Sequence, residues 1–236
     1  MLRLCGVSFM LACLLTLGWG AAGAATPQRA VFSVKLTATL SKDWTVRRAT
    51  TDEGECDKIT TTTGRWTLSL GTTRSSRIVI QGPAAAGKPL RISAGLVRAI
   101  AGTARQTGSA RLQQRGPRCV SSTTTRACGP QTRSFRIASA RLTSRTRGLA
   151  RFSAMRGASA GRAFRGSCPE QPEEIRAIRT DLALADAPLD VADVFAKDVP
   201  RFFISGNTVQ ETTIEGDYDG KVTERVRWTL TFTRLR

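Results

Sequence analysis

Apolar and polar side chains alternate most clearly near the C-terminus of the chain. One parity carries the apolar residues Val222, Val226, Trp228, Leu230 and Phe232, and the other carries mainly threonine and arginine. Such period-two alternation is typical of a strand with one buried and one exposed face. The preceding dipeptide Asp219-Gly220 predicts a type I′ turn, so residues 207–235 are expected to form a hairpin.

A similar alternation appears near the start of the chain. Residues 30–46 predict a strand that continues past a bulge near its end and whose inward side chains are Phe32, Val34, Leu36, Ala38 and Leu40. Residues 60–70 predict a second strand, and residues 65–70 repeat the register of residues 227–232. Trp66 and Trp228 share the apolar faces of their strands, so we expect both in the core.

The middle of the chain alternates less clearly. Residues 94–115 favour short irregular strands over a helix, because Gly102 and Gly108 would each cost a helix about 1 kcal/mol relative to alanine. Residues 131–142 and 148–155 are expected to pair as strands, and residues 188–196 to form a short helix. The prediction is an all-β, mainly antiparallel, β-sandwich-like fold over residues 26–236 with one or two short helices, or two small β units divided near 83–89.

The N-terminus has the features of an export signal. Arg3 precedes an apolar run from Leu4 to about Trp19, and Ala22 and Ala24 form a small-residue cleavage site. The apolar run is shorter than the ~20 residues of a membrane-spanning helix, although an uncleaved anchor is the alternative. Residues 1–25 are therefore expected to be a cleaved signal peptide, and the protein to be secreted or associated with the cell envelope.

Four cysteines remain once residues 1–25 are removed: Cys56, Cys119, Cys128 and Cys168. In an exported chain they predict two disulfides. One pairing joins Cys119 to Cys128 and Cys56 to Cys168, and a second joins Cys128 to Cys168 and Cys56 to Cys119. The sequence leaves both pairings open.

Positive charge dominates the chain and is unevenly distributed. The formal net charge is +18, and the segment from Lys58 to Pro169 contains twenty-one lysines or arginines without a single aspartate or glutamate. Such a field is either a solvated surface or a face for anionic partners. The candidate anion-binding residues are Arg105, Arg111, Arg115, Arg118, Arg133, Arg136, Arg141, Arg145, Arg147 and Arg151.

The chain contains no histidine, and this absence excludes several kinds of catalysis. Ser-His-Asp hydrolases, Cys-His proteases and histidine-ligated zinc hydrolases all require that residue. No C-x-x-C pair is present either, so we expect neither a metal site nor a cofactor. Aromatic residues are too sparse within the basic segment for a single-strand nucleic-acid platform, and no dedicated nucleic-acid partner is expected.

Among common hydrolytic mechanisms, the sequence does not exclude one that uses a pair of carboxylates. Glu224 together with Asp217 or Asp219 could serve a carbohydrate-active domain, although an inward Glu224 is more often a buried ion pair. The segment from Glu215 to Gly220 lacks the later glutamate of a calcium loop, which favours a turn. Trp44, near a predicted strand end, is the best single candidate for surface recognition.

The overall layout resembles that of exported β-rich proteins of high-GC Gram-positive bacteria that have no known activity. The resemblance rests on residues 65–70 and 225–235 and on Cys128-Gly129 and Cys168-Pro169, and it implies no functional residues. The sequence thus predicts a non-enzymatic exported protein whose arginine-rich surface associates with anionic polysaccharides, wall polymers or lipid headgroups. A carbohydrate-active domain and a purely structural domain are the alternatives.

Overall fold

The computed structural model describes residues 27–51, 56–83, 90–93, 95–117, 119–144, 149–155, 175 and 187–236. The expected signal peptide lies outside these residues. The described strands are β1 (Gln28–Thr51), β2 (Asp57–Thr72), β3 (Ser76–Gly82), β4 (Arg91–Ser93), β5 (Leu96–Arg115), β6 (Ser122–Ser144), β7 (Leu149–Met155), β8 (Ala187–Pro188), β9 (Arg201–Ile214) and β10 (Asp219–Arg234). Helix α2 (Val191–Phe195) begins after Asp190, whose side chain accepts a hydrogen bond from the Ala192 amide at 2.8 Å.

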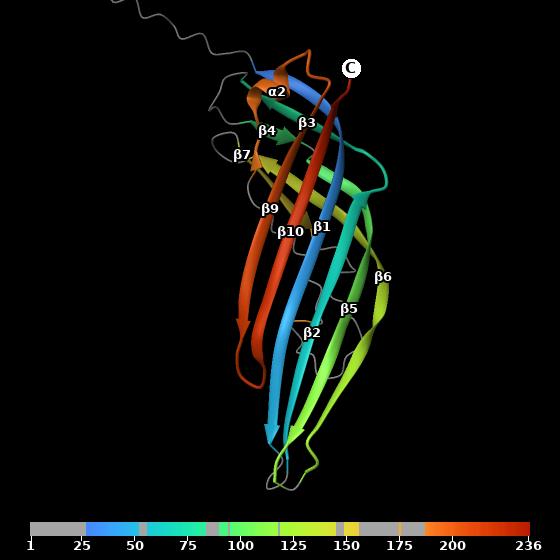
Figure 1. The fold of residues 1–236 in the computed structure, drawn as a ribbon. Helices are drawn as coiled ribbons and strands as arrows, with labels where there is room; N and C mark the ends of the chain where they lie inside the picture. Colours follow the sequence, from blue (N-terminus) through green and yellow to red (C-terminus); the bar gives the residue numbers. More distant parts are fainter. Residues whose placement is uncertain are drawn as a thin grey trace, which may run out of the picture.

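All ten strands belong to one open sheet in which every pairing is antiparallel. β1 is its central strand. One edge of β1 pairs with β10, and the other edge pairs first with β3 and then with β2. The long strands β9, β10, β1, β2, β5 and β6 lie side by side in an elongated curved sheet, with α2, β3 and β4 toward one end (Figure 1). The all-β antiparallel class is therefore confirmed. It takes the form of one open sheet, where a sandwich-like arrangement was expected.

The hydrophobic core lies on one face of the sheet. We call this the inner face, and Phe32, Leu36 and Leu40 of β1 point to it. All three side chains are buried, as are Trp66 in β2 and Trp228 in β10. The prediction that both tryptophans lie in one core is confirmed. β2 and β10 flank β1 on its two edges, so the repeated segments from opposite ends of the chain meet across it.

Three phenylalanines join the ends of β1, β9 and β10 on this face. The rings of Phe202 and Phe232 are stacked with centroids 4.7 Å apart, and Phe32 meets both edge-on at 5.1 and 5.8 Å. Burying each ring contributes about 1.5–3 kcal/mol relative to leaving it in water. Residues on both sides of 83–89 share this core cluster, since Leu90 and Val97 belong to it together with Phe32.

Several local predictions are confirmed and others are wrong. The predicted pairing of residues 131–142 with 148–155 does occur, between residues 139–144 of β6 and 150–155 of β7, and the short helix forms as α2. β1 runs without the expected bulge, because its register against β10 is continuous. Residues 96–115 form one long strand where short irregular ones were expected.

The predicted turn at Asp219-Gly220 is also wrong. β10 already begins at Asp219, and Gly220 pairs with Ile214 of β9. The chain reverses through residues 215–218, where Gly216 has a φ of +107°. A left-handed backbone of this kind favours glycine, which explains why the reversal occurs there.

The described part of the chain contains a disulfide between Cys56 and Cys119. This bond is one of the two pairings that the sequence left open for these residues. Because Cys119 is bonded to Cys56, the alternative Cys119–Cys128 bond is wrong, and Cys128 is itself disulfide-bonded. Cys168 lies outside the described residues. No helix among the described residues has the length and apolar composition needed to cross a membrane.

Candidate anion-binding face

The face of the sheet opposite the core, which we call the outer face, is built from hydroxyl and cationic side chains. Odd-numbered positions of β1, β2 and β10, and those of β5 beyond Ile100, point to this face because the even-numbered ones supply the core. One cross-strand row joins Thr45, Thr63 and Ser109, and the hydroxyls of Thr63 and Ser109 lie 3.1 Å apart. The alternation that builds the core therefore also builds a polar outer face.

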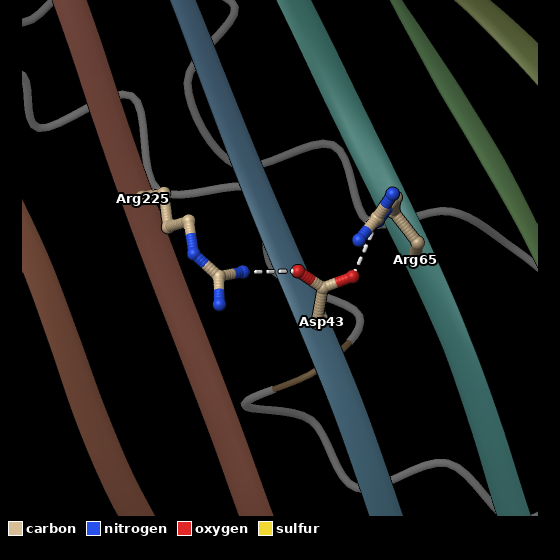
Figure 2. Close-up of polar contacts among 3 residues, drawn as sticks. All are labelled: Asp43, Arg65 and Arg225. Atoms are coloured by element: carbon tan, nitrogen blue, oxygen red, sulfur yellow. Dashed lines mark hydrogen bonds and ion pairs between the residues drawn. The ribbon is translucent and has the colours of Figure 1, made fainter.

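An ion-pair cluster lies near the middle of this face. Asp43 of β1 stands between Arg65 of β2 and Arg225 of β10, and Figure 2 shows both arginine side chains reaching toward its carboxylate. Nη1 of Arg225 donates to Oδ2 of Asp43 at 2.5 Å, and Nε of Arg65 donates to Oδ1. Each carboxylate oxygen thus holds one guanidinium, and the cluster spans three neighbouring strands.

The two arginines of the cluster remain open to solvent. The side chains of Arg65 and Arg225 are 63% and 43% exposed, whereas that of Asp43 is 27% exposed. The hydrogen bond that Arg65 donates to Asp43, and then the charge of Asp43, raise the pKa of Arg65 above the ordinary value, so this guanidinium is always charged. Two cations against one anion leave one unit of positive charge, with guanidinium N–H groups directed toward water.

A shallow groove of about 890 Å³ runs beside this cluster. Its lining contains two members of the cluster and several hydroxyl groups: Asp43, Arg65, Thr45, Thr63, Thr107, Ser109 and Thr223. Gly64 and Gly108 lie opposite each other at its floor. A Cβ on Gly64 would overlap the ring of Trp44, so glycine is needed there for the indole to lie on the inner face.

The arginines that the sequence predicted as anion-binding candidates do not all lie on the outer face. Arg105, Arg111 and Arg136 are exposed, and their cross-strand partners place them on the outer face. Arg115 and Arg141 are also exposed, and Arg115 lies opposite Asp57.

The remaining candidates are placed elsewhere or are not described. Arg133 lies opposite the buried Ala104 and is half-buried, so it points to the inner face. Arg118, Arg145 and Arg147 lie outside the described residues, and the side chain of Arg151 is not described.

Glu224 faces inward, as expected, and forms an ion pair there. One of its carboxylate oxygens lies 2.6 Å from Nζ of Lys42, whose side chain is 3% exposed. Asp219 lies opposite Arg47 on the outer face, and Asp217 is exposed in the loop before β10. The structure does not bring Glu224 together with either aspartate, because Glu224 and Asp219 are on opposite faces of β10. The carboxylate pair considered for sugar chemistry is not assembled.

Trp44 does not lie at the surface. It is 3% exposed, because the strand continues to Thr51 and leaves Trp44 well inside β1. The proposal that Trp44 serves surface recognition is therefore wrong. Within the described ranges, no group of three or more His, Cys, Asp or Glu side chains is placed to hold a metal ion.

The sequence did not single out the Asp43 cluster. Arg65 lies 22 residues from Asp43 and Arg225 lies 182 residues from it, so their meeting depends on the strand order. The one available signal for the cluster was the parity of Asp43, which is opposite to that of the core residues of β1.

Searches against protein-family models, curated proteins and solved structures found no match to this chain. The functional argument therefore rests on the surface itself.

Proposed function

We propose that the protein is a non-enzymatic, exported protein whose outer face associates with anionic polymers of the cell envelope. The observation that carries the proposal is the excess of exposed cations on this one face, which include Lys35, Arg47, Arg65, Arg105, Arg111, Arg115, Arg136, Lys221 and Arg227. The acids described on the same face are fewer: Asp43, Asp57, Glu211 and Asp219. An excess of one sign over an extended surface attracts polyanions.

A polymer fits this face better than a lipid headgroup layer does. The face follows long, twisted strands, and its hydroxyl rows offer hydrogen bonds along their length. Four large apolar side chains are exposed in the described chain: Phe203 and Val209 on the outer face of the edge strand β9, Val120 in a loop and Leu235 near the C-terminus. Among the described residues of β1, β2, β5 and β10, the outer face exposes no large apolar side chain to insert among acyl chains.

The test measures binding of the oxidised protein, purified from an exporting host, to immobilised polyanion over a salt gradient. Two double variants lose the same charge: Arg105→Gln with Arg111→Gln on the outer face, and Arg74→Gln with Arg126→Gln away from it. Arg126 lies opposite Ala110, whose parity is that of the inner face, and Arg74 lies in the turn after β2. The first variant should bind about five- to tenfold more weakly, since each exposed ion contact contributes up to about 1 kcal/mol.

The second variant should bind within about twofold of the parent protein, because long-range attraction is screened by salt. Equal weakening of both variants would show that net charge alone drives binding. Elution of the parent protein at the same low salt as a neutral control would refute the proposed function. Binding to anionic vesicles but not to the soluble polyanion would indicate lipid headgroups as the partner.

A further inference from the structure

We propose that Asp43 is a positioning residue that holds Arg65 and Arg225 as a paired site for a phosphate group of the polymer. This inference rests on the proposed function and assigns the chemical class of its ligand. Asp43 lies directly opposite Arg65 on β2, whereas Arg225 reaches it diagonally from β10. The carboxylate therefore draws two guanidiniums from opposite sides toward one point.

Each guanidinium keeps most of its donors after binding Asp43. Arg65 uses Nε, which leaves both of its Nη groups, and Arg225 uses Nη1, which leaves Nη2 and Nε. These side chains are 63% and 43% exposed, so a ligand can reach them. Holding long side chains in advance lowers the conformational entropy lost on binding, which is about 1.5–2 kcal/mol for a free arginine.

A phosphate group suits this pair better than a carboxylate does. Its tetrahedral oxygens can accept hydrogen bonds from two guanidiniums that approach from different strands, whereas a carboxylate satisfies one guanidinium in a planar pair. Hydroxyls line the adjoining groove, including those of Thr45, Thr63 and Ser109. The site therefore fits a phosphodiester-linked polyol or sugar chain, with phosphate at the arginines and hydroxyls along the groove.

The role of Asp43 can be tested because two explanations predict opposite signs. If attraction to net charge governs binding, Asp43→Asn removes a negative charge and strengthens it. If Asp43 positions the arginines, the same change releases both guanidiniums and weakens binding. Glu211→Gln is the matched control, because Glu211 is exposed in the same cross-strand row, opposite Thr223, which is itself opposite Asp43.

The probe is synthetic poly(glycerol phosphate), compared with hyaluronate as a carboxylate polymer and with phosphatidylglycerol vesicles. Binding is measured by calorimetry at 0.15 M salt, with circular dichroism to verify folding. Asp43→Asn should weaken binding to poly(glycerol phosphate) by roughly tenfold, the value of one or two charge-assisted hydrogen bonds. Glu211→Gln should leave it unchanged or strengthen it by up to about twofold.

A second variant, Arg65→Lys with Arg225→Lys, retains the charge and loses the planar fork. It should weaken binding to the phosphate polymer by about fivefold and leave hyaluronate binding nearly unchanged. Tighter binding by Asp43→Asn, or equal affinity of the parent protein for both polymers, would overturn the inference while leaving the proposed function standing. Preference for the vesicles over poly(glycerol phosphate) would overturn the assignment of a polymer. Failure of the parent protein to bind any probe would overturn the proposed function itself.

Discussion

The Lys42–Glu224 ion pair on the inner face allows a quantitative test of how the sheet is stabilised. The two side chains lie directly opposite each other on β1 and β10, with Nζ and Oε1 2.6 Å apart. Lys42 is 3% exposed and Glu224 is 27% exposed, so the ammonium is the more deeply buried partner. Nζ of Lys42 also lies 6.0 Å from the centroid of the Trp66 ring. We expect the two possible deletions to be unequal.

Glu224→Gln should cost more stability than Lys42→Met. The glutamine variant removes the carboxylate that balances a buried ammonium, and breaking a fully buried pair costs about 3–5 kcal/mol. Because Glu224 is about one quarter exposed, we expect a smaller loss of about 2–3 kcal/mol. Lys42→Met retains the apolar stem and leaves a carboxylate that can turn toward water, so a loss of about 1–2 kcal/mol is expected.

The assay is urea unfolding of the oxidised protein, followed by tryptophan fluorescence, for both single variants and the double variant. The double-mutant cycle should give a coupling free energy of about 1–2 kcal/mol. Lys35→Met is the control, because Lys35 is exposed on the outer face and its loss should change stability by less than about 0.5 kcal/mol. A cost for Lys42→Met that equals or exceeds that for Glu224→Gln would refute the reasoning, as would coupling below about 0.5 kcal/mol.

Two further changes test packing and covalent stabilisation. Gly64→Ala should lower the free energy of unfolding by about 1–3 kcal/mol, because its Cβ would overlap the Trp44 ring. Gly129→Ala is the control in the same thermal denaturation experiment, and it should be nearly neutral because nothing lies within 4 Å of its added Cβ. Replacing both Cys56 and Cys119 with serine should cost about 4 kcal/mol in urea titration, the chain-entropy value for a sequence separation of 63, and a loss below about 1 kcal/mol would contradict this account.

Sequence alternation identified the strands whose two faces meet different environments. In β1, β2 and β10 the apolar residues keep one parity because one face is buried, so the core could be predicted residue by residue. Residues 96–115 were harder, because Gly102 and Gly108 resemble strand or helix breakers. In the structure an added Cβ at either glycine would meet the backbone of β2, so both residues serve close strand approach. That reason becomes visible only when the neighbouring strand is known.

The candidate site was less predictable than the core. Composition indicated arginines as ligands for anions, and it directed attention to the acid-free segment. The Asp43 cluster instead combines one arginine from within that segment with Arg225, which lies beyond it. Its formation depends on β1 standing between β2 and β10, a strand order that local propensity does not encode. The sequence alone therefore could not show that Asp43 pairs with Arg65 and Arg225, because this depends on which strands lie beside β1.

The Lys42–Glu224 ion pair also helps to set the register of β1 against β10. A slip of one residue between β1 and β10 would turn apolar side chains to the outer face, so the hydrophobic pattern alone excludes it. A slip of two residues keeps every side chain on its own face and is excluded less strongly. It would place Lys42 opposite Val222 or Val226 instead of Glu224, leaving a buried ammonium beside an apolar partner.

The outer face does not discriminate against the same error. Asp43 lies opposite Thr223 and meets Arg225 diagonally, and a slip of two residues would place it directly opposite Arg225 or Lys221, so a cation would face it in either case. The register between β1 and β10 is therefore specified on the inner face, by the Lys42–Glu224 pair and the apolar side chains around it. Once the inner face has set this register, Asp43 stands between Arg65 and Arg225, which is the arrangement that we propose prepares the phosphate site.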